Sequence, residues 1–213
     1  MDFIPSAGVL TAFTLAAITL AITPGPDMTL FLSKTIGQST RAGLASMLGA
    51  ACGMLVHSVL VAIGLAAVLA ASATAFTVLK VIGALYLAYL AYDALRHGAR
   101  LNLDGAVATA DPLWSVYLKG VAINLLNPKV IAFFVTFLPQ FVSQSDPHAS
   151  AKLLFLGVWL TVIGIVVCTV LIGFAGRFAR LLRRSRRAAR MVDYALATVL
   201  GAFAVKLLAT RAS

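Results

Sequence analysis

The sequence predicts an all-α membrane protein with six transmembrane helices, arranged as two inverted three-helix repeats. Of its 213 residues, 61% are hydrophobic and only 11% are charged, whereas a soluble domain carries about 25% charged residues. The mean hydropathy is +0.98. The apolar residues fall into six runs, and a spanning helix needs about 20 such residues. Two of these runs, three helices apart, are interrupted at prolines.

The apolar runs place the spans approximately at residues 6–33, 43–70, 77–95, 114–142, 153–176 and 191–209. The start of the chain, Met1–Pro5, lacks the basic segment that opens a signal peptide, so the first span is expected to be retained. The whole chain, 1–213, then forms a single transmembrane domain. The first repeat covers about 1–96 and the second about 113–213.

The first span contains the stretch Thr23-Pro24-Gly25-Pro26-Asp27, here called the first break. A proline inside a helix removes an N–H and clashes with the preceding turn, at a cost of roughly 3 kcal/mol. Broken backbone at membrane depth is tolerated only where it is buried in protein or lines a watery cavity. The first break is therefore expected to face inward. Thr23 is the expected N-cap of a new half-helix, with Pro24 in its first position.

The span 114–142 contains the second break, Asn127-Pro128-Lys129. Asn127 suits an N-cap and Pro128 the first helical position. A helix that starts there offers free N–H groups and about half a positive charge to an anion. Three spans lie on each side of the loop 96–113, and an odd number inverts the second half relative to the first. The two half-helix N-termini are therefore expected to converge inside the membrane.

The two breaks bring one acid and one base to the predicted meeting point. Asp27 could pair with the ammonium group of a free amino acid, while Lys129 and the helix N-termini could bind its carboxylate. Ionisable groups inside a membrane are costly and are functional hypotheses by default. An alternative is an Asp27–Lys129 ion pair that only joins the two spans. The candidate substrate-binding residues are Thr23, Pro24, Gly25, Pro26, Asp27, Asn127, Pro128 and Lys129.

Asp27 and His57 are the candidates for a proton relay. His57 is the ionisable residue of the span 43–70, and its ordinary pKa is close to neutral. It shares a face of small residues that should point into the bundle: Ser46, Gly49, Gly53, His57 and Gly64. A packing role for a hydrogen-bonded histidine is the alternative. The span 153–176 has a similar small face: Gly157, Thr161, Gly164 and Cys168.

The aromatic end of the span 114–142 contains Phe134 and Gln140, which are candidates for an outer gate. Packing and anchoring at the membrane interface are the alternative for these residues. Gly49 and Gly53 form a GxxxG pair, which permits close packing between helices. Because such pairs also join subunits, the sequence allows a homodimer.

The formal net charge of +10 fits membrane topology better than nucleic-acid binding, because the basic residues gather between the apolar runs. Three alternate loops carry eleven Lys and Arg residues, and the opposite side carries Lys152 and Arg211. The rich side is expected in the cytoplasm, which places both termini in the periplasm. Seven arginines lie between Arg177 and Arg190, where they could also bind anionic lipid head groups.

At these motifs the chain resembles the LysE/RhtB family of bacterial amino-acid exporters. The matching stretches are ITPGPDMTLFLS at 22–33, RAGLASMLGAACG at 41–53, LKVIGALYLAYLAYDALR at 79–96 and GVAINLLNPKVIAFFVTFLPQF at 120–141. The resemblance implies a secondary active exporter in the bacterial inner membrane, in the branch that exports threonine, homoserine or homoserine lactone. It also implies exchange for protons. The family's motif residues correspond to Pro24, Gly25, Pro26, Asp27, Asn127, Pro128, Lys129, Pro139 and Gln140.

Two alternatives of another class remain open at this point. A membrane thiol–disulfide carrier would use Cys52 and Cys168, but such carriers place their cysteines beside the prolines of the two breaks. A cation exporter of the same superfamily fold would need clustered His, Cys, Asp or Glu ligands, and here these residues are few and scattered. The sequence contains no nucleophile–base pair and no metal motif, so we expect neither an enzyme nor a cofactor.

Overall fold

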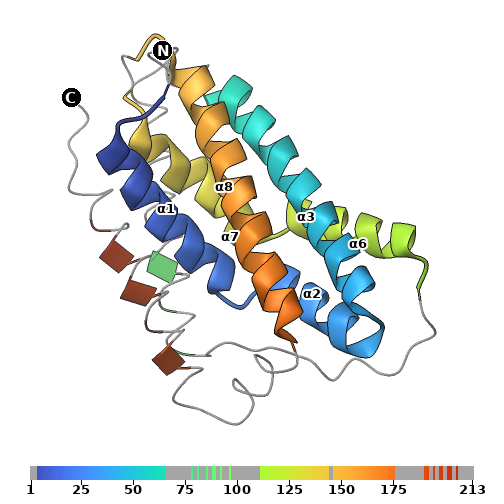
Figure 1. The fold of residues 1–213 in the computed structure, drawn as a ribbon. Coiled ribbons are helices and arrows are strands. Elements are labelled where there is room, and N and C mark those ends of the chain that lie inside the picture. The colour runs from blue at the N-terminus through green and yellow to red at the C-terminus, as the bar shows by residue number, and fades with distance from the viewer. Residues whose placement is uncertain are drawn as a thin grey trace.

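The computed structural model describes residues 4–65, 111–143 and 146–175, with isolated positions between 78 and 96 and between 190 and 205. The regular structure of this part of the chain is helical (Figure 1). The predicted spans 77–95 and 191–209 and the arginines of 177–187 lie outside the described residues, apart from isolated helical positions. The all-α class is confirmed, whereas the inverted repeat remains a prediction.

The first half of the described chain consists of α1 (Ala7–Ile22), α2 (Pro26–Gly37) and α3 (Thr40–Leu60), which continues as the π-helical turn η1 (Val61–Leu65). The second half consists of α6 (Leu113–Leu125), α7 (Pro128–Ala132), the π-helical turn η2 (Phe133–Phe137), the 3-10 turn η3 (Leu138–Phe141) and α8 (Ala149–Gly173). Pro139 lies in η3 and cannot donate a helical hydrogen bond, which fits the loss of regular α-helix there.

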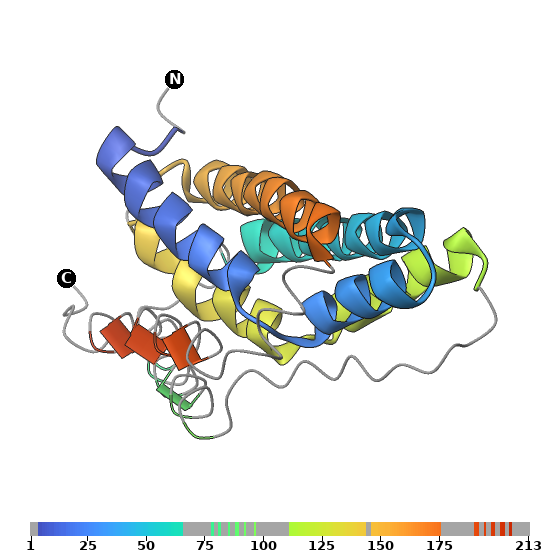
Figure 2. The same ribbon diagram turned by 60° about the horizontal axis from the view of Figure 1, so that its bottom comes forward.

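Both predicted interruptions are present. The pair α1 and α2 bends by 54° at the first break, and the pair formed by α6 and Pro128–Phe141 bends by 48° at the second. Among the described residues, Thr40–Gly64 and Ala149–Gly173 are each long and apolar enough to cross a membrane, and each bent pair passes the same test when taken as one span. Figure 2, in which the bottom of Figure 1 comes forward, shows the turn between α1 and α2.

Helix α3 contacts α2, α6 and α8. Small residues let α3 and α6 approach until their backbones touch. A Cβ added to Gly49 would lie 2.1 Å from the carbonyl oxygen of Tyr117, and one added to Gly120 would lie 2.1 Å from that of Ser46. The predicted inward face is thereby confirmed for Ser46, Gly49 and Gly53, which are buried.

Gly64 does not belong to this inward face. It is exposed, and no described atom lies within 4 Å of the place where its Cβ would be. The helix is π-helical from Val61 to Leu65, and the wider turn shifts the residues that follow away from the 3.6-residue register. The predicted small face of α8 does point inward, since Gly157 packs against Ser58 and Thr161 is 3% exposed.

An aromatic cluster joins α1 to the helical turns after the second break. Phe13 lies 5.2–6.3 Å from the rings of Phe133, Phe137 and Phe141, measured between ring centres. Phe13 and Phe137 are fully buried. Edge-to-face and offset aromatic pairs of this kind contribute about 0.5–1.5 kcal/mol beyond their burial. The cluster therefore packs α1 against the helical turns that follow the second break.

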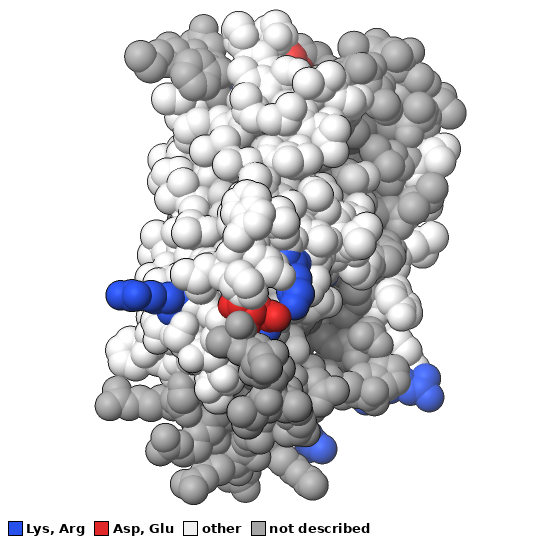
Figure 3. Space-filling model, turned by 90° about the vertical axis from the view of Figure 1, so that its right-hand side faces the viewer, with Lys and Arg blue, Asp and Glu red and all other residues white. Residues whose placement is uncertain are grey.

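The outer surface separates an apolar band from a charged end. On α8, Val158, Val162, Val166 and Val170 form an exposed stripe at four-residue spacing, as expected for a helix facing acyl chains. Figure 3, which views the molecule from the right-hand side of Figure 1, shows an uncharged area above a group of charged side chains. At the end where α2 stops and α6 begins, the Asp111 carboxylate accepts hydrogen bonds from Lys34 at 2.6 Å and Lys119 at 2.8 Å.

Candidate functional site

The two breaks meet inside the protein. Oδ2 of Asp27, in the first turn of α2, accepts hydrogen bonds from Nδ2 of Asn124 and Nδ2 of Asn127, each at 2.9 Å. Asn124 lies in the last turn of α6, and Asn127 begins α7. One carboxylate oxygen of the first half is therefore held by two amides of the second half, on either side of its break.

The second break reaches back to the first through Lys129. Its Nζ donates to the carbonyl oxygen of Thr23 at 3.0 Å and lies 3.4 Å from that of Leu20. These carbonyls end α1, where the helix dipole is negative. The side chain crosses Gly25 so closely that an added Cβ would lie 3.0 Å from Nζ. A glycine at this position therefore leaves room for the ammonium group.

The second break has the predicted cap, but the first does not. The Asn127 side chain accepts a hydrogen bond from Lys129 N at 3.0 Å, and Pro128 follows in the first helical position. At the first break, the prediction that Thr23 caps the new half-helix is wrong. α2 begins at Pro26 with Gly25 as its N-cap, and the Thr23 hydroxyl donates to the Thr19 carbonyl at 2.6 Å.

The second proline explains this correction. A residue that precedes proline is driven out of the α region toward an extended conformation. Gly25 precedes Pro26 and is extended, with φ −171° and ψ −177°. A helix starting at Pro24 would need Gly25 in a helical conformation, so the helix starts at Pro26 instead. Pro24 consequently lies in the connection between α1 and α2.

Asp27 and Lys129 lie on the same cavity without forming an ion pair with each other among the described residues. Each has other partners: amides for the carboxylate, carbonyls for the ammonium. The direct ion pair of that alternative is absent from the described residues. Each charge nevertheless joins the two spans through a neutral partner, so a purely structural role for the two charges stays an open alternative.

The cavity has a volume of about 70 Å³ and lies between α1, α2, α3 and α8, with Asn124 and Lys129 at its inner wall. A water needs about 10–15 Å³ measured in this way, so the cavity holds on the order of five waters, comparable with a small amino acid. Oδ1 of Asp27 and Oδ1 of Asn124 are buried, and no hydrogen-bond partner for either lies in the described part of the chain. Asp27 and Asn124, two residues of the cavity wall, therefore each keep one acceptor oxygen unpaired.

His57, Phe134 and Gln140 are not among the residues that line this cavity, although His57 lies beside the backbone of Asn124. The His57 ring stacks on Phe134 with 5.4 Å between ring centres, and its Nε2 is buried without a partner among the residues described. Phe134 is fully buried in the core, and Gln140 donates to the carbonyl of Thr136 at 2.9 Å. The gate formed by Phe134 and Gln140 and the relay through His57 remain predictions.

Sequence reasoning missed Asn124, the one cavity amide outside both breaks. It is 1% exposed, and it comes three residues before Asn127 in an otherwise apolar stretch. A polar residue in a predicted span, one helical turn before a break, is a signal that could have identified it. The methionines around the cavity, Met28, Met47 and Met54, were also missed, because methionine is ordinary in any apolar run.

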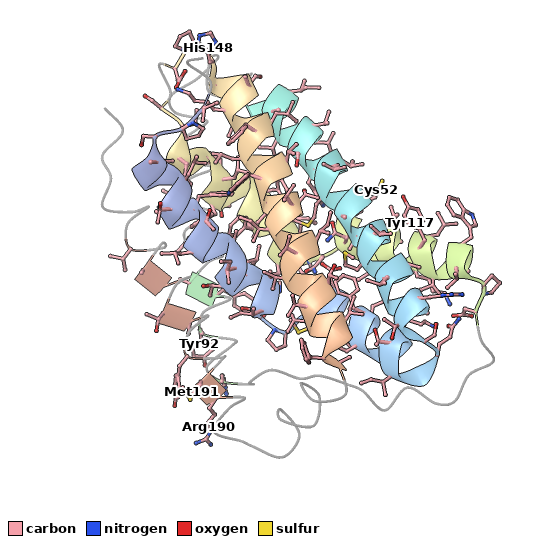
Figure 4. All side chains as sticks on the ribbon, viewed as in Figure 1. Cys52, Tyr92, Tyr117, His148, Arg190 and Met191 are labelled. Atoms are coloured by element: carbon pink, nitrogen blue, oxygen red, sulfur yellow. The ribbon has the colours of Figure 1, made fainter. Side chains whose placement is uncertain are left out.

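Both cysteines are free thiols on separate helices. Figure 4 shows Cys52 and Tyr117 beside each other where α3 meets α6. Cys168 lies on α8 and lines the cavity. Neither lies within the two breaks, as a thiol–disulfide carrier of the kind considered above would require.

Two bent spans that exchange polar contacts around an internal cavity are typical of membrane carriers of small solutes. Broken helices that meet at the midplane recur in carriers of small solutes, where the backbone released by the break lines the binding site. The family comparison is specific: the sequence pattern of the "LysE type translocator" family matches residues 18–211. The chain belongs to the LysE-type translocators, a family of transporters rather than enzymes.

The chain is also similar to individual bacterial membrane proteins, two of which have names that describe efflux. The chain is 35% identical to an "Uncharacterized membrane protein" of Vibrio cholerae over 86% of its own length and 88% of the relative's. It is 32% identical to a "Homoserine/homoserine lactone efflux protein" of Salmonella typhimurium, covering 79% and 81% of the two chains. It is 26% identical to a "Leucine efflux protein" of the same organism, covering 78% and 79%. No solved structure matches the chain.

Proposed function

We propose that this protein exports amino acids or close derivatives across the bacterial inner membrane by exchange for protons, with the substrate held between the two breaks. The observation that supports this most directly is the pair of unpaired oxygens, Oδ1 of Asp27 and Oδ1 of Asn124, which belong to two residues of the cavity that Lys129 also lines. An ammonium group has donors for both oxygens. A solute with an ammonium at one end and a carboxylate at the other has a partner for each charge here.

The ammonium of the substrate binds at Asp27 and Asn124. Oδ2 of Asp27 already accepts two amide hydrogen bonds, which fix the plane of the carboxylate and leave Oδ1 for a ligand. Charge-assisted hydrogen bonds of this kind are about twice as strong as neutral ones. The substrate therefore replaces the missing donor at two buried acceptors, whose lack of a partner costs free energy in the empty protein.

The carboxylate of the substrate binds at Lys129. An ammonium group has three N–H donors, and the carbonyl oxygens of Thr23 and Leu20 occupy two of those of Lys129. The third donor is left for the substrate. Because the same lysine crosses Gly25 at the start of α2, the carboxylate also comes close to the positive end of that helix.

Proton exchange follows from competition for one oxygen. A proton on Oδ1 of Asp27 neutralises the carboxylate and removes the partner of the ammonium, so that proton and substrate bind in turn. His57 is one helical turn from Gly53, which packs on Asn124, and is the candidate to pass the proton onward. Export and this coupling are taken from the family resemblance and from the names of the relatives, which include homoserine, homoserine lactone and leucine efflux.

The orientation proposed here has both termini in the periplasm. It rests on the excess of Lys and Arg in alternate loops and on the pairing of two inverted three-helix repeats. The charged end formed by Lys34, Asp111 and Lys119 then lies on the cytoplasmic side. The arginines up to Arg190 lie on that side as well, where anionic lipid heads are available.

The test is efflux from proteoliposomes loaded with labelled amino acids, with and without a pH gradient. Asp27→Asn should fold normally, because the amide oxygen can still accept from Asn124 and Asn127, but transport should be lost. Asp146→Asn is the matched control. Asp146 pairs with Lys152 before the start of α8 and does not line the cavity, so this variant should retain transport. A fully active Asp27→Asn protein would refute the proposed site.

A further inference from the structure

We infer that the cavity selects amino acids with an apolar side chain over amino acids with a hydroxylated one. This inference rests on the proposed function and concerns the same site. It narrows the substrate class from the threonine and homoserine kind to the leucine and methionine kind. The argument depends on what lines the cavity beyond its polar end, which consists of Thr23, Asp27, Asn124 and Lys129.

The polar groups of the cavity lie together and belong to the two breaks. Asp27 is bonded to Asn124, and Lys129 is bonded to the carbonyl of Thr23. Thr161 on α8 is the remaining polar side chain of the lining. The rest of the wall is apolar and comes from α1, α2, α3, α7 and α8. A substrate whose charged groups occupy the polar end must therefore place its side chain among apolar groups.

The cavity walls include Met28 on α2, Met47 and Met54 on α3, and Cys168 on α8. Methionine is unbranched and polarisable, and it adapts its shape to an apolar partner at little cost. Met54 is packed against α8, with its sulfur 3.7 Å from the place of a Cβ on Gly164. Three such side chains form a wall that can close around branched or unbranched apolar groups and offers them no strong hydrogen-bond partner.

The two threonine hydroxyls of the lining are already donated to backbone. Thr23 donates to the Thr19 carbonyl at 2.6 Å, and Thr161 donates to the Gly157 carbonyl at 2.9 Å. A substrate hydroxyl would therefore find only their remaining lone pairs. Burying a hydroxyl without a good partner is unfavourable, and an apolar pocket discriminates by about 10–200-fold for each methylene or similar group. We expect a preference of roughly tenfold to a hundredfold for leucine over homoserine.

The test compares efflux of labelled leucine, methionine, homoserine and threonine from proteoliposomes that contain the whole protein, each at limiting concentration. Leucine and methionine should leave at least roughly ten times faster than the hydroxylated pair. Met54→Gln keeps the length of the side chain and adds polar atoms, and should reduce this ratio several-fold. Met191→Gln is the matched control, because Met191 is 71% exposed and lies away from α3 and α8 (Figure 4).

The outcomes separate this inference from the proposed function. If homoserine and threonine leave as fast as leucine, the inference is overturned while the proposed function stands. If Thr161→Val then abolishes only homoserine and threonine efflux, Thr161 is a hydroxyl-binding residue and the inference is overturned by a named contact. If none of the four amino acids is transported, the proposed function itself fails. A leucine preference that Met54→Gln reduces and Met191→Gln retains supports the inference.

Discussion

The close approach of the α3 and α6 backbones predicts a large effect from one added methyl group. In Gly49→Ala, the new Cβ would lie 2.1 Å from the Tyr117 carbonyl oxygen and 3.0 Å from the Val121 nitrogen. Both are backbone atoms, so no side chain can rotate away. The Cβ would be roughly 1.3 Å short of an ordinary contact of 3.4 Å, and α3 and α6 would have to separate.

Overpacking a tight interface costs about 1–3 kcal/mol, and we expect the upper end of that range because only backbone can move. Since about 1 kcal/mol moves Tm by about 2–4 °C in a chain of this size, Tm should fall by about 6–12 °C. A dye that becomes fluorescent on reacting with thiols measures this in detergent, because Cys52 and Cys168 are free.

Gly64→Ala is the matched control for this measurement. Gly64 is exposed, and within the described residues nothing lies within 4 Å of the added Cβ. A surface change of this kind stays within about 0.5 kcal/mol, so Tm should move by less than about 2 °C. If Gly49→Ala were as stable as Gly64→Ala, the close approach of α3 and α6 would be refuted.

Three further changes test the breaks and the charged end. Gly25→Ala should push Lys129 Nζ aside by a few tenths of an ångström and slow efflux up to roughly tenfold at unchanged Tm; unchanged efflux would contradict the tight crossing. Lys129→Met leaves the carbonyl of Thr23 without its donor. The free energy of unfolding should therefore fall by about 1–3 kcal/mol, measured as a lower Tm, and efflux should cease. At Asp111, hydrogen bonds from Lys119 and Lys34 lower the pKa to about 2. Its stabilising effect is therefore complete above about pH 4 and is lost toward pH 2, so the acid-induced fall in Tm should be smaller in Asp111→Asn.

The breaks could be predicted from sequence because proline chemistry is local. Pro128 after Asn127 is enough to predict where α7 begins, and the structure agrees. At the first break the same rule chose Pro24, but two prolines compete there and the residue between them decides. The extended Gly25 before Pro26 moves the helix start by two positions. A rule applied to single residues cannot weigh one proline against the next.

The partners of the charged groups could not be predicted, because they depend on tertiary contacts. The sequence suggested Asp27 and Lys129 as partners of each other, since they have opposite charges. In the structure the carboxylate binds Asn124 and Asn127, and the ammonium binds backbone carbonyls at the end of α1. The packing of α3 on α6 brings Asn124 to that position, and its place one helical turn before the second break does not by itself identify Asp27 as its partner.

The exchange of hydrogen bonds between the two breaks also constrains the order in which the protein can be made. Asp27 and its partner Asn127 are 100 residues apart. The carbonyl of Thr23 accepts its hydrogen bond from Lys129, which is synthesised 106 residues later. While the ribosome adds those residues, the first half has carbonyls and a carboxylate at mid-membrane depth without their final partners, which lipid cannot supply. The nascent first half must therefore keep this bend hydrated or sheltered by the insertion machinery, and it reaches its final form only after the second half has entered the bilayer.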